Sequence, residues 1–391
     1  MPTLTTQRDI QHRRLTRRRF LHLAGGTVAA TALGPWGLKG AAANAAWRQN
    51  QAAGFGPLAP DPKGRLMLPA GFQYREFAIE GQPLGSGGVV PGRHAGMAAC
   101  AGPRGTVILV RNHELAFEGA DDPTANPVQP KNPYSAEQWG GTTASVVGPD
   151  RTELDSFVTS SGTAVNCAGG ATPWGTWLTR EETTPADMSG DGFTSQKPHG
   201  YVFKVDPSDL ENDRSRTPIK EMGLFSHEAV GFDPGTGIFY LTEDGETEAD
   251  PIDPGNDTGG SFLFRFIPFI PNDLSRRPGA LQKSGRTQAL KVEQLPEAND
   301  ADLFDAGQRF GTVWVDVDPA GPTEEAAAKD CPRFNRLEGA HFAGGAFRFR
   351  DTNGGEQRLG RIFRYLPATN SLELFYEGED STGAPEVEDA G

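Results

Sequence analysis

Three residues that can bind metal ions stand at matching places in three similar stretches of the chain. Cys167, Glu228 and Glu338 are each followed by a glycine-containing turn, a short predicted strand and an acidic strand end. The acidic end comes 14, 15 and 13 residues after the first residue (167 to 181, 228 to 243 and 338 to 351). A pattern that returns at such regular spacing indicates an internal structural repeat.

Equivalent residues of a circular repeat meet near its axis, so we expect these three side chains to lie together. A thiolate favours a softer transition metal such as iron or zinc, whereas carboxylates favour hard ions such as Ca²⁺. Clustered carboxylates repel one another unless cations neutralise them. Further carboxylates that we expect at this metal site are those of Glu114, Glu181, Glu182 and Glu243.

Arg336 stands two residues before Glu338 and can bind an anion through two parallel hydrogen bonds. Metal ions beside an arginine are typical of phosphate-binding sites, where they stabilise phosphoryl transfer. Simpler interpretations also exist. A lone cysteine in a glycine-rich strand is usually a small buried hydrophobe, and the acidic strand ends can be solvated loop charges. Structural roles are favoured for His113, His199 and His227.

The elements that must position these residues are short strands. Hydrophobic residues make up 36% of the 391 residues, with 50 Gly and 31 Pro, which suits many strands joined by turns. Repeat units begin near residues 95, 167, 228 and 338, and the wide last interval leaves room for another unit near 285. Units of this size fit four-stranded blades, so the sequence predicts an all-β chain with a β-propeller fold. Predicted strands include 72–79, 106–110, 142–147, 174–179, 238–241, 260–268, 312–317, 346–349 and 360–367.

The bulk composition limits the class of protein. A net charge of −14 argues against nucleic acid as a partner. Residues 1–46 carry the twin-arginine pattern Arg17-Arg18, a weakly apolar stretch and a small-residue cleavage site, which predicts a signal peptide. The predicted mature domain, 47–391, would leave through the twin-arginine translocase and act in the periplasm or outside the cell. No later stretch approaches 18 apolar residues, so no membrane span is expected.

The chain resembles the PhoX family of alkaline phosphatases, which carry a DUF839-type domain. The resemblance rests on the twin-arginine leader and on five motifs. These motifs are Arg111-Asn112-His113-Glu114, the run from Asn166 to Glu182, Phe225-Ser226-His227-Glu228-Ala229-Val230, Tyr240-Leu241-Thr242-Glu243-Asp244 and Arg336-Leu337-Glu338-Gly339.

The resemblance implies a six-bladed propeller that binds Fe³⁺ and Ca²⁺ at its axis and hydrolyses a small phosphorylated substrate. By match, Cys167, Glu228 and Glu338 are metal ligands, and Glu338 can bridge to calcium. Arg336 is the phosphate-binding residue, so Arg336 and Glu338 are the predicted catalytic residues. Asn112 is expected on the substrate side, and Glu114 on the calcium or substrate side.

Two departures from the family pattern leave other functions open. Relatives usually carry an acid after the residue that matches His94, where this chain has Ala95. The chain also stops at Gly391, where a further unit would begin near 385–389, so the last blade is expected to be missing or incomplete. One alternative is therefore a non-catalytic metal- or ligand-binding propeller. Another is a Ca²⁺-dependent lactonase or phytase, whose site would use oxygen ligands alone.

Overall fold

The computed structural model describes residues 55–117, 125–184, 189–190, 193–208, 215–245, 260–269, 281, 284–293, 305–355 and 357–378. The predicted leader, residues 1–46, and the segment 385–389 lie outside these residues. The chain divides into two compact units, one made of Met1–Glu76 with Gly378–Gly391 and the other of Phe77–Glu377.

In the first unit, β1 (Leu58–Ala59) pairs antiparallel with β2 (Leu68–Pro69). Asp61 holds the loop between them, because its carboxylate accepts hydrogen bonds from three backbone N–H groups and from the Tyr74 hydroxyl. The strand predicted over residues 72–79 is wrong: its residues alternate in polarity, but no part of it joins a sheet.

The second unit begins with two antiparallel groups of strands. In each group, strands that follow one another in the sequence are neighbours in the sheet. The first group is β3 (His94–Ala101), β4 (Val107–His113), β5 (Gly140–Val147) and β6 (Glu153–Thr163). The second group is β7 (Gly169–Ala171), β8 (Trp177–Arg180) and β11 (Val202–Val205).

Two further groups of four strands are joined by a single strand that lies between them and pairs with both. Together they form one continuous nine-stranded sheet. The third group is β12 (His227–Phe232), β13 (Phe239–Glu243), β14 (Leu263–Pro268) and β15 (Gly285–Val292). The fourth is β17 (Leu337–Ala343), β18 (Ala346–Asp351), β19 (Arg361–Leu366) and β20 (Ser371–Glu377). Between them, β16 (Arg309–Asp316) pairs with β15 along one half and with β20 along the other.

The remaining described elements are short. The short pair β9 (Ser189–Gly190) and β10 (Phe193–Thr194) forms its own sheet. One α-helix is described, α3 (Pro322–Ala328), with proline in its first turn and two glutamates that favour its N-terminal end. Single 3₁₀ turns cover Pro103–Gly105, Lys220–Met222 and Pro367–Thr369.

The prediction of an all-β chain is confirmed, because strands dominate the described residues. The unit expected near residue 285 is wrong, since β15 is the fourth strand of the third group rather than the start of a new one. Among the described residues, none of the helices has the length and apolar character that a membrane crossing requires.

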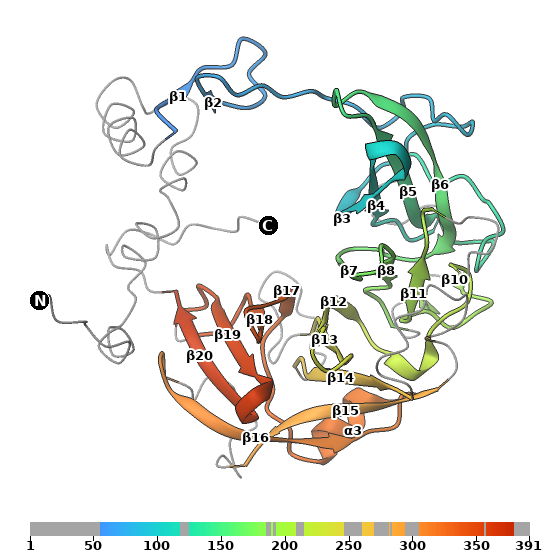
Figure 1. Ribbon diagram of the computed structural model, residues 1–391. Helices are drawn as coiled ribbons and strands as arrows, with labels where there is room; N and C mark the ends of the chain where they lie inside the picture. The colour runs from blue at the N-terminus through green and yellow to red at the C-terminus, as the bar shows by residue number, and fades with distance from the viewer. Residues whose placement is uncertain are drawn as a thin grey trace, which may run out of the picture. The chain divides into compact units, whose positions relative to one another are not determined.

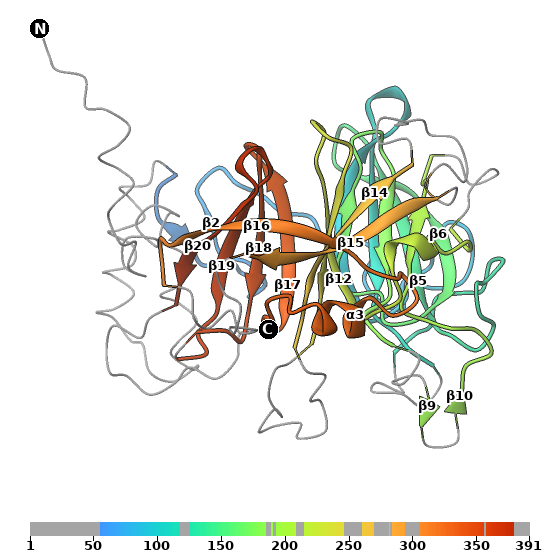
Figure 2. The ribbon, with the colours of Figure 1, turned by 90° about the horizontal axis from the view of Figure 1, so that it is seen from below.

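The first strands of the four groups lie beside one another in sequence order (Figure 1). β3 contacts β7, β7 contacts β12, and β12 contacts β17. In the view turned by 90°, β12 and β17 remain neighbours (Figure 2). Three of these strands are irregular at the same place, with register shifts after His94 in β3, His227 in β12 and Leu337 in β17. Such bulges re-aim a side chain beside a site, and they follow the predicted repeat.

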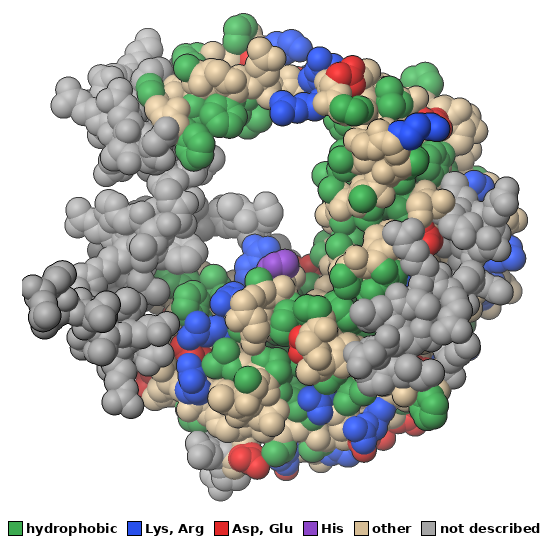
Figure 3. All heavy atoms as spheres, in the orientation of Figure 1, with side chains coloured by type: hydrophobic (Ala, Val, Ile, Leu, Met, Phe, Trp, Pro, Cys, Tyr) green, Lys and Arg blue, Asp and Glu red, His purple; other side chains and the backbone are tan. Residues whose placement is uncertain are grey.

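Apolar side chains hold neighbouring groups together. One cluster packs Leu178 and Val202 of the second group against Phe239, Phe264 and other residues of the third. Another joins Tyr240 of the third group to the apolar face of the fourth. The second face of the fourth group is charged: Arg309 and Arg364 pair with Glu373 at 2.6 Å and 2.7 Å. Figure 3 shows Lys and Arg side chains over these strands.

Glycine lets the first strands approach closely. A Cβ on Gly170 of β7 would lie 2.2 Å from the backbone oxygen of Val230 on β12. We expect Gly170→Ala to lower the free energy of unfolding by about 1–3 kcal/mol, because the two backbones must separate. Urea denaturation measures this. Gly311→Ala is the control, since its Cβ would approach only the flexible Glu293 carboxylate at 3.4 Å. Equal effects of the two changes would contradict close packing of β7 on β12.

Candidate functional site

Cys167 lies in a short connection just before β7, where several backbone contacts fix it. Val165, two residues earlier, has a φ of 47°, which is rare and strained for a β-branched residue. The Val165 oxygen accepts hydrogen bonds from the N–H groups of Cys167 (3.0 Å) and Glu182 (2.9 Å). The Cys167 oxygen accepts one from Gly96 of β3 at 2.8 Å. This connection therefore holds Cys167 and Glu182 close together.

Asn112 is buried and also fixes the backbone at Cys167. Its Nδ2 donates to the backbone oxygens of Cys167 at 2.9 Å and Ala168 at 2.7 Å. Its Oδ1 accepts hydrogen bonds from Trp177 Nε1 at 2.8 Å and Thr179 Oγ1 at 2.9 Å. With every polar atom engaged inside the protein, Asn112 positions Cys167, in place of the substrate-side role that the resemblance implied.

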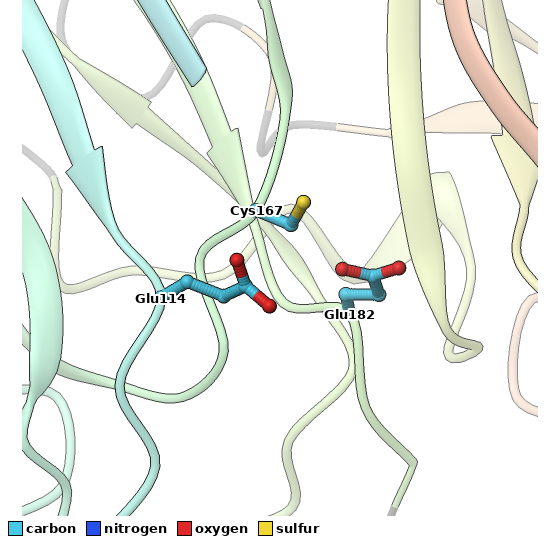
Figure 4. Close-up of side chains that lie close together, drawn as sticks. All are labelled: Glu114, Cys167 and Glu182. Atoms are coloured by element: carbon cyan, nitrogen blue, oxygen red, sulfur yellow. The ribbon is translucent and has the colours of Figure 1, made fainter. Parts of the chain in front are cut away.

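Three possible ligand atoms meet at the ends of β4 and β8. One atom from each of Glu114, Cys167 and Glu182 lies within 4.8 Å of the others, and all three residues are half-buried. Figure 4 shows the two carboxylates and the sulfur facing one another from separate segments. The Cys167 thiol also forms a hydrogen bond with Glu182. A thiol and two carboxylates at this spacing can surround one metal ion.

Glu228 and Glu338 extend this group. Glu228 is buried. Burial of the Cys167 thiol raises its pKa, and the nearby charge of Glu228 raises it further. Glu338 lies beside Glu228. Burial and the nearby charges of Glu228 and Asp244 raise the pKa of Glu338 from 4.5 to about 8. The three residues predicted to converge thus lie together in the folded chain.

Arginines offset part of this negative charge. Arg336 Nη2 lies 3.1 Å from Glu338 Oε1, and Arg336 Nε lies 3.3 Å from Asp244 Oδ1. The Arg336 backbone is left-handed, with a φ of 61°. Arg180 is fully buried and contacts Glu228 at 3.4 Å. Burial, followed by the nearby charges of Glu228, Asp244 and Glu338, still raises the pKa of Glu182 well above its usual range.

Glu181 and Glu243, both predicted as metal ligands, lie elsewhere. Glu181 is buried and accepts hydrogen bonds from the N–H groups of Ala164, Gly200 and Tyr201, while His199 Nδ1 lies 2.6 Å away. Glu243 is buried against Thr323 and the N–H of Phe262, and burial raises its pKa to about 8. Glu181 thus holds the backbone after β6 and before β11, and Glu243 holds α3 and the backbone before β14, so both carboxylates make structural contacts.

Glu182 and Asp244, which follow Glu181 and Glu243 in the chain, point to the site instead, because side chains alternate along a strand. The repeat aligns Glu114, Glu182 and Asp244 at that next position. His113, at the position of Glu181 and Glu243, binds Gly92 and Thr143 at 2.8 Å each, as expected for a structural histidine. The predicted acidic strand end was therefore one residue too early in the repeats that begin at Cys167 and Glu228.

The family model described as alkaline phosphatase PhoX matches residues 53–156 and 148–389. This chain belongs to the PhoX family. No curated protein matches the chain. Among solved structures, Pseudomonas fluorescens PhoX in complex with vanadate, a transition-state analogue, matches with 16% identity and a TM-score of 0.47. The match covers 72% of this chain and 66% of that protein, so this chain spans just under two thirds of its length.

Sequence reasoning gave no role to one residue of this PhoX-family site. Arg180 stands within the quoted run from Asn166 to Glu182, directly before Glu181. Arg180 ends a strand whose other residues are all buried. A charge at such a place indicates a buried partner of opposite charge, so it was a usable signal. Asp244 was quoted only as the last residue of a motif, whereas it pairs with Arg336 and lies near Glu182 and Glu338.

Proposed function

We propose that this chain is an exported, metal-dependent phosphatase that hydrolyses phosphomonoesters of small molecules. Family membership supports the reaction class. The observation that carries the proposal for this chain is the convergence of Cys167, Glu228 and Glu338 beside Arg336. A thiol and several acids next to an arginine form a site for both metal ions and a phosphoryl group.

We further propose that the four antiparallel groups are blades of a six-bladed β-propeller. Their first strands lie side by side, and those of the second, third and fourth groups begin within two residues of Cys167, Glu228 and Glu338. In a propeller, the first strands line the axis, so residues at their bulges meet there. Ala95 stands at this position in the first group, which therefore brings no carboxylate to the cluster.

The residues present fit iron and calcium. Cys167 supplies a soft ligand atom, which suits iron, and Glu114, Glu182, Glu228 and Glu338 supply the oxygens that calcium favours. The raised pKa values of Glu182 and Glu338 fit a site whose charge is balanced by bound cations. When bound, such ions activate the attacking oxygen and neutralise charge on the phosphoryl group. An all-oxygen lactonase or phytase site does not account for the thiol.

Arg336 is placed to bind the phosphoryl group. Its side chain is partly exposed, at 39%, although it contacts Glu338 and Asp244. A phosphoryl oxygen can take the place of one carboxylate contact, and the guanidinium then stabilises the charge that develops in the transition state. Glu338 pairs with Arg336 and lies beside Glu228, so we assign it the role of linking the phosphate-binding and metal-binding parts.

The test is hydrolysis of p-nitrophenyl phosphate by the purified chain loaded with Fe³⁺ and Ca²⁺. We expect turnover that a chelator abolishes, and Arg336→Ala should lower kcat/KM on the order of 10²-fold. Arg286→Ala is the control, because Arg286 lies on the surface in an exposed pair with Asp316. Bound metal without hydrolysis would reject the phosphatase and favour a binding propeller. Equal losses in both variants would remove Arg336 from its proposed role.

Export by the twin-arginine translocase is also a proposal, and it rests on Arg17-Arg18 and the segment that follows. The protein would then act in the periplasm or outside the cell. Cell fractionation in a strain that lacks this translocase measures the route. Retention of the chain inside those cells is expected, and unchanged export would contradict the proposal.

A further inference from the structure

Arg180 is a cation built into the acidic site. It is the last residue of β8, and its side chain is fully buried. Both Nη1 and Nη2 lie 3.4 Å from the same oxygen of Glu228, Oε2, and Nε has no hydrogen-bond partner. The guanidinium thus makes two long contacts with one oxygen, and it does not hold the second oxygen of Glu228.

Arg180 lies among side chains of the kind that bind metal ions. Besides Glu228, its charge interacts with Cys167, Glu182 and Glu338, which are the groups proposed to bind metal. An arginine side chain stays protonated in proteins. Removing it from water is costly unless acids surround it. Its position is therefore explained by the same negative charge that would attract metal ions.

The repeat shows that a buried charge at this position is particular to the second group, because Arg350, the equivalent residue of the fourth group, is exposed. Asn112, Arg180 and Thr242 stand at equivalent positions, each two residues before an acid of the site. Asn112 donates to the backbone oxygen of Cys167, and Thr242 Oγ1 donates to that of Glu338 at 3.1 Å. In both cases a neutral side chain holds the backbone of the next first strand. Only Arg180, among these three, holds a carboxylate.

We propose that Arg180 takes the place of one bound cation beside Glu228, and so limits how many Ca²⁺ ions the site binds and how tightly. The inference rests on the proposed function, because it concerns the metal content of the same site. A full positive charge on the same carboxylate opposes the binding of a further cation there, because like charges repel one another strongly at a buried site. Removing that charge should therefore strengthen Ca²⁺ binding.

The experiment titrates Ca²⁺ into the chelator-treated full chain by calorimetry and measures the metal-to-protein ratio by elemental analysis. We expect Arg180→Gln to bind one more Ca²⁺ ion, or to bind Ca²⁺ at least ~10-fold more tightly than the unaltered chain. Arg180→Lys keeps the charge and should behave like the unaltered chain. Arg361→Gln is the matched control, because Arg361 is also buried and pairs with Glu377 at 3.7 Å outside the site.

If Arg180→Gln folds poorly, the Tm of this variant with and without Ca²⁺ still tests the proposal. A Ca²⁺ ion that replaces the guanidinium should restore the variant, so Ca²⁺ should raise its Tm more than that of the unaltered chain. Unchanged stoichiometry and affinity would overturn the proposal, as would a variant that stays unfolded at every Ca²⁺ concentration. None of these readings needs phosphatase activity, so loss of the proposed function and loss of this inference are distinguishable.

Discussion

Replacing Cys167 by alanine is expected to abolish metal-dependent hydrolysis of p-nitrophenyl phosphate, with a loss on the order of 10³-fold. Cys167 supplies the only sulfur among the ligand atoms that meet at Glu114 and Glu182 within the described residues. Without it, the site keeps oxygen ligands alone, and its preference for a softer metal is lost. The iron content of the purified protein should fall together with the rate.

Two further variants separate metal loss from damage to the fold. Cys331→Ala removes a thiol that is buried in the apolar core, and burial raises the pKa of that thiol to about 11. This control should lose some stability but keep its metal and its rate. Cys167→Ser keeps the size of the side chain with a poorer ligand for iron, so it should resemble Cys167→Ala. Full activity and full iron content in Cys167→Ala would end the proposed role of the thiol.

Replacing Glu181 by glutamine is expected to lower the free energy of unfolding by about 2–4 kcal/mol. The Glu181 carboxylate accepts hydrogen bonds from three buried backbone N–H groups, and His199 Nδ1 lies against one of its oxygens. Either orientation of a glutamine amide would place its NH₂ group against buried N–H donors. Urea denaturation of the metal-free protein measures the loss.

The adjacent residue provides a matched comparison. Glu182→Gln should cost less than about 1 kcal/mol in the metal-free protein, because burial and like charges already disfavour an ionised Glu182. That variant should instead lose metal and phosphatase activity. If Glu181→Gln lost metal without losing stability, while Glu182→Gln did the reverse, the assignment of the two carboxylates would have to be exchanged.

The sequence alone predicted the repeat and much of the strand pattern. Cys167, Glu228 and Glu338 recur before similar turns and strands, and in the structure β12 and β17 start at that point while Cys167 lies two residues before β7. A repeat is visible in sequence because each unit must bury the same faces against its neighbours. The prediction over residues 72–79 failed because alternation indicates a strand only where a partner strand is present.

The side chains that face the site could not be chosen from sequence with the same certainty. Glu181 and Glu182 are adjacent acids at the end of one strand, and a shift of one residue moves a side chain to the opposite side. Only the folded chain shows that Glu181 binds the backbone at Gly200 and Tyr201, while Glu182 meets Cys167.

Residue types, spacing and the recurring turns therefore determined which segments form strands and which three residues are equivalent. Tertiary structure decided the rest: that Arg180 is buried against Glu228, that Asn112 holds the backbone of Cys167, and that Arg336 lies between Glu338 and Asp244. All of these contacts except that between Arg336 and Glu338 join residues from different strand groups. Their existence depends on how the groups pack and on bulges in the first strands, neither of which any single segment of the sequence specifies.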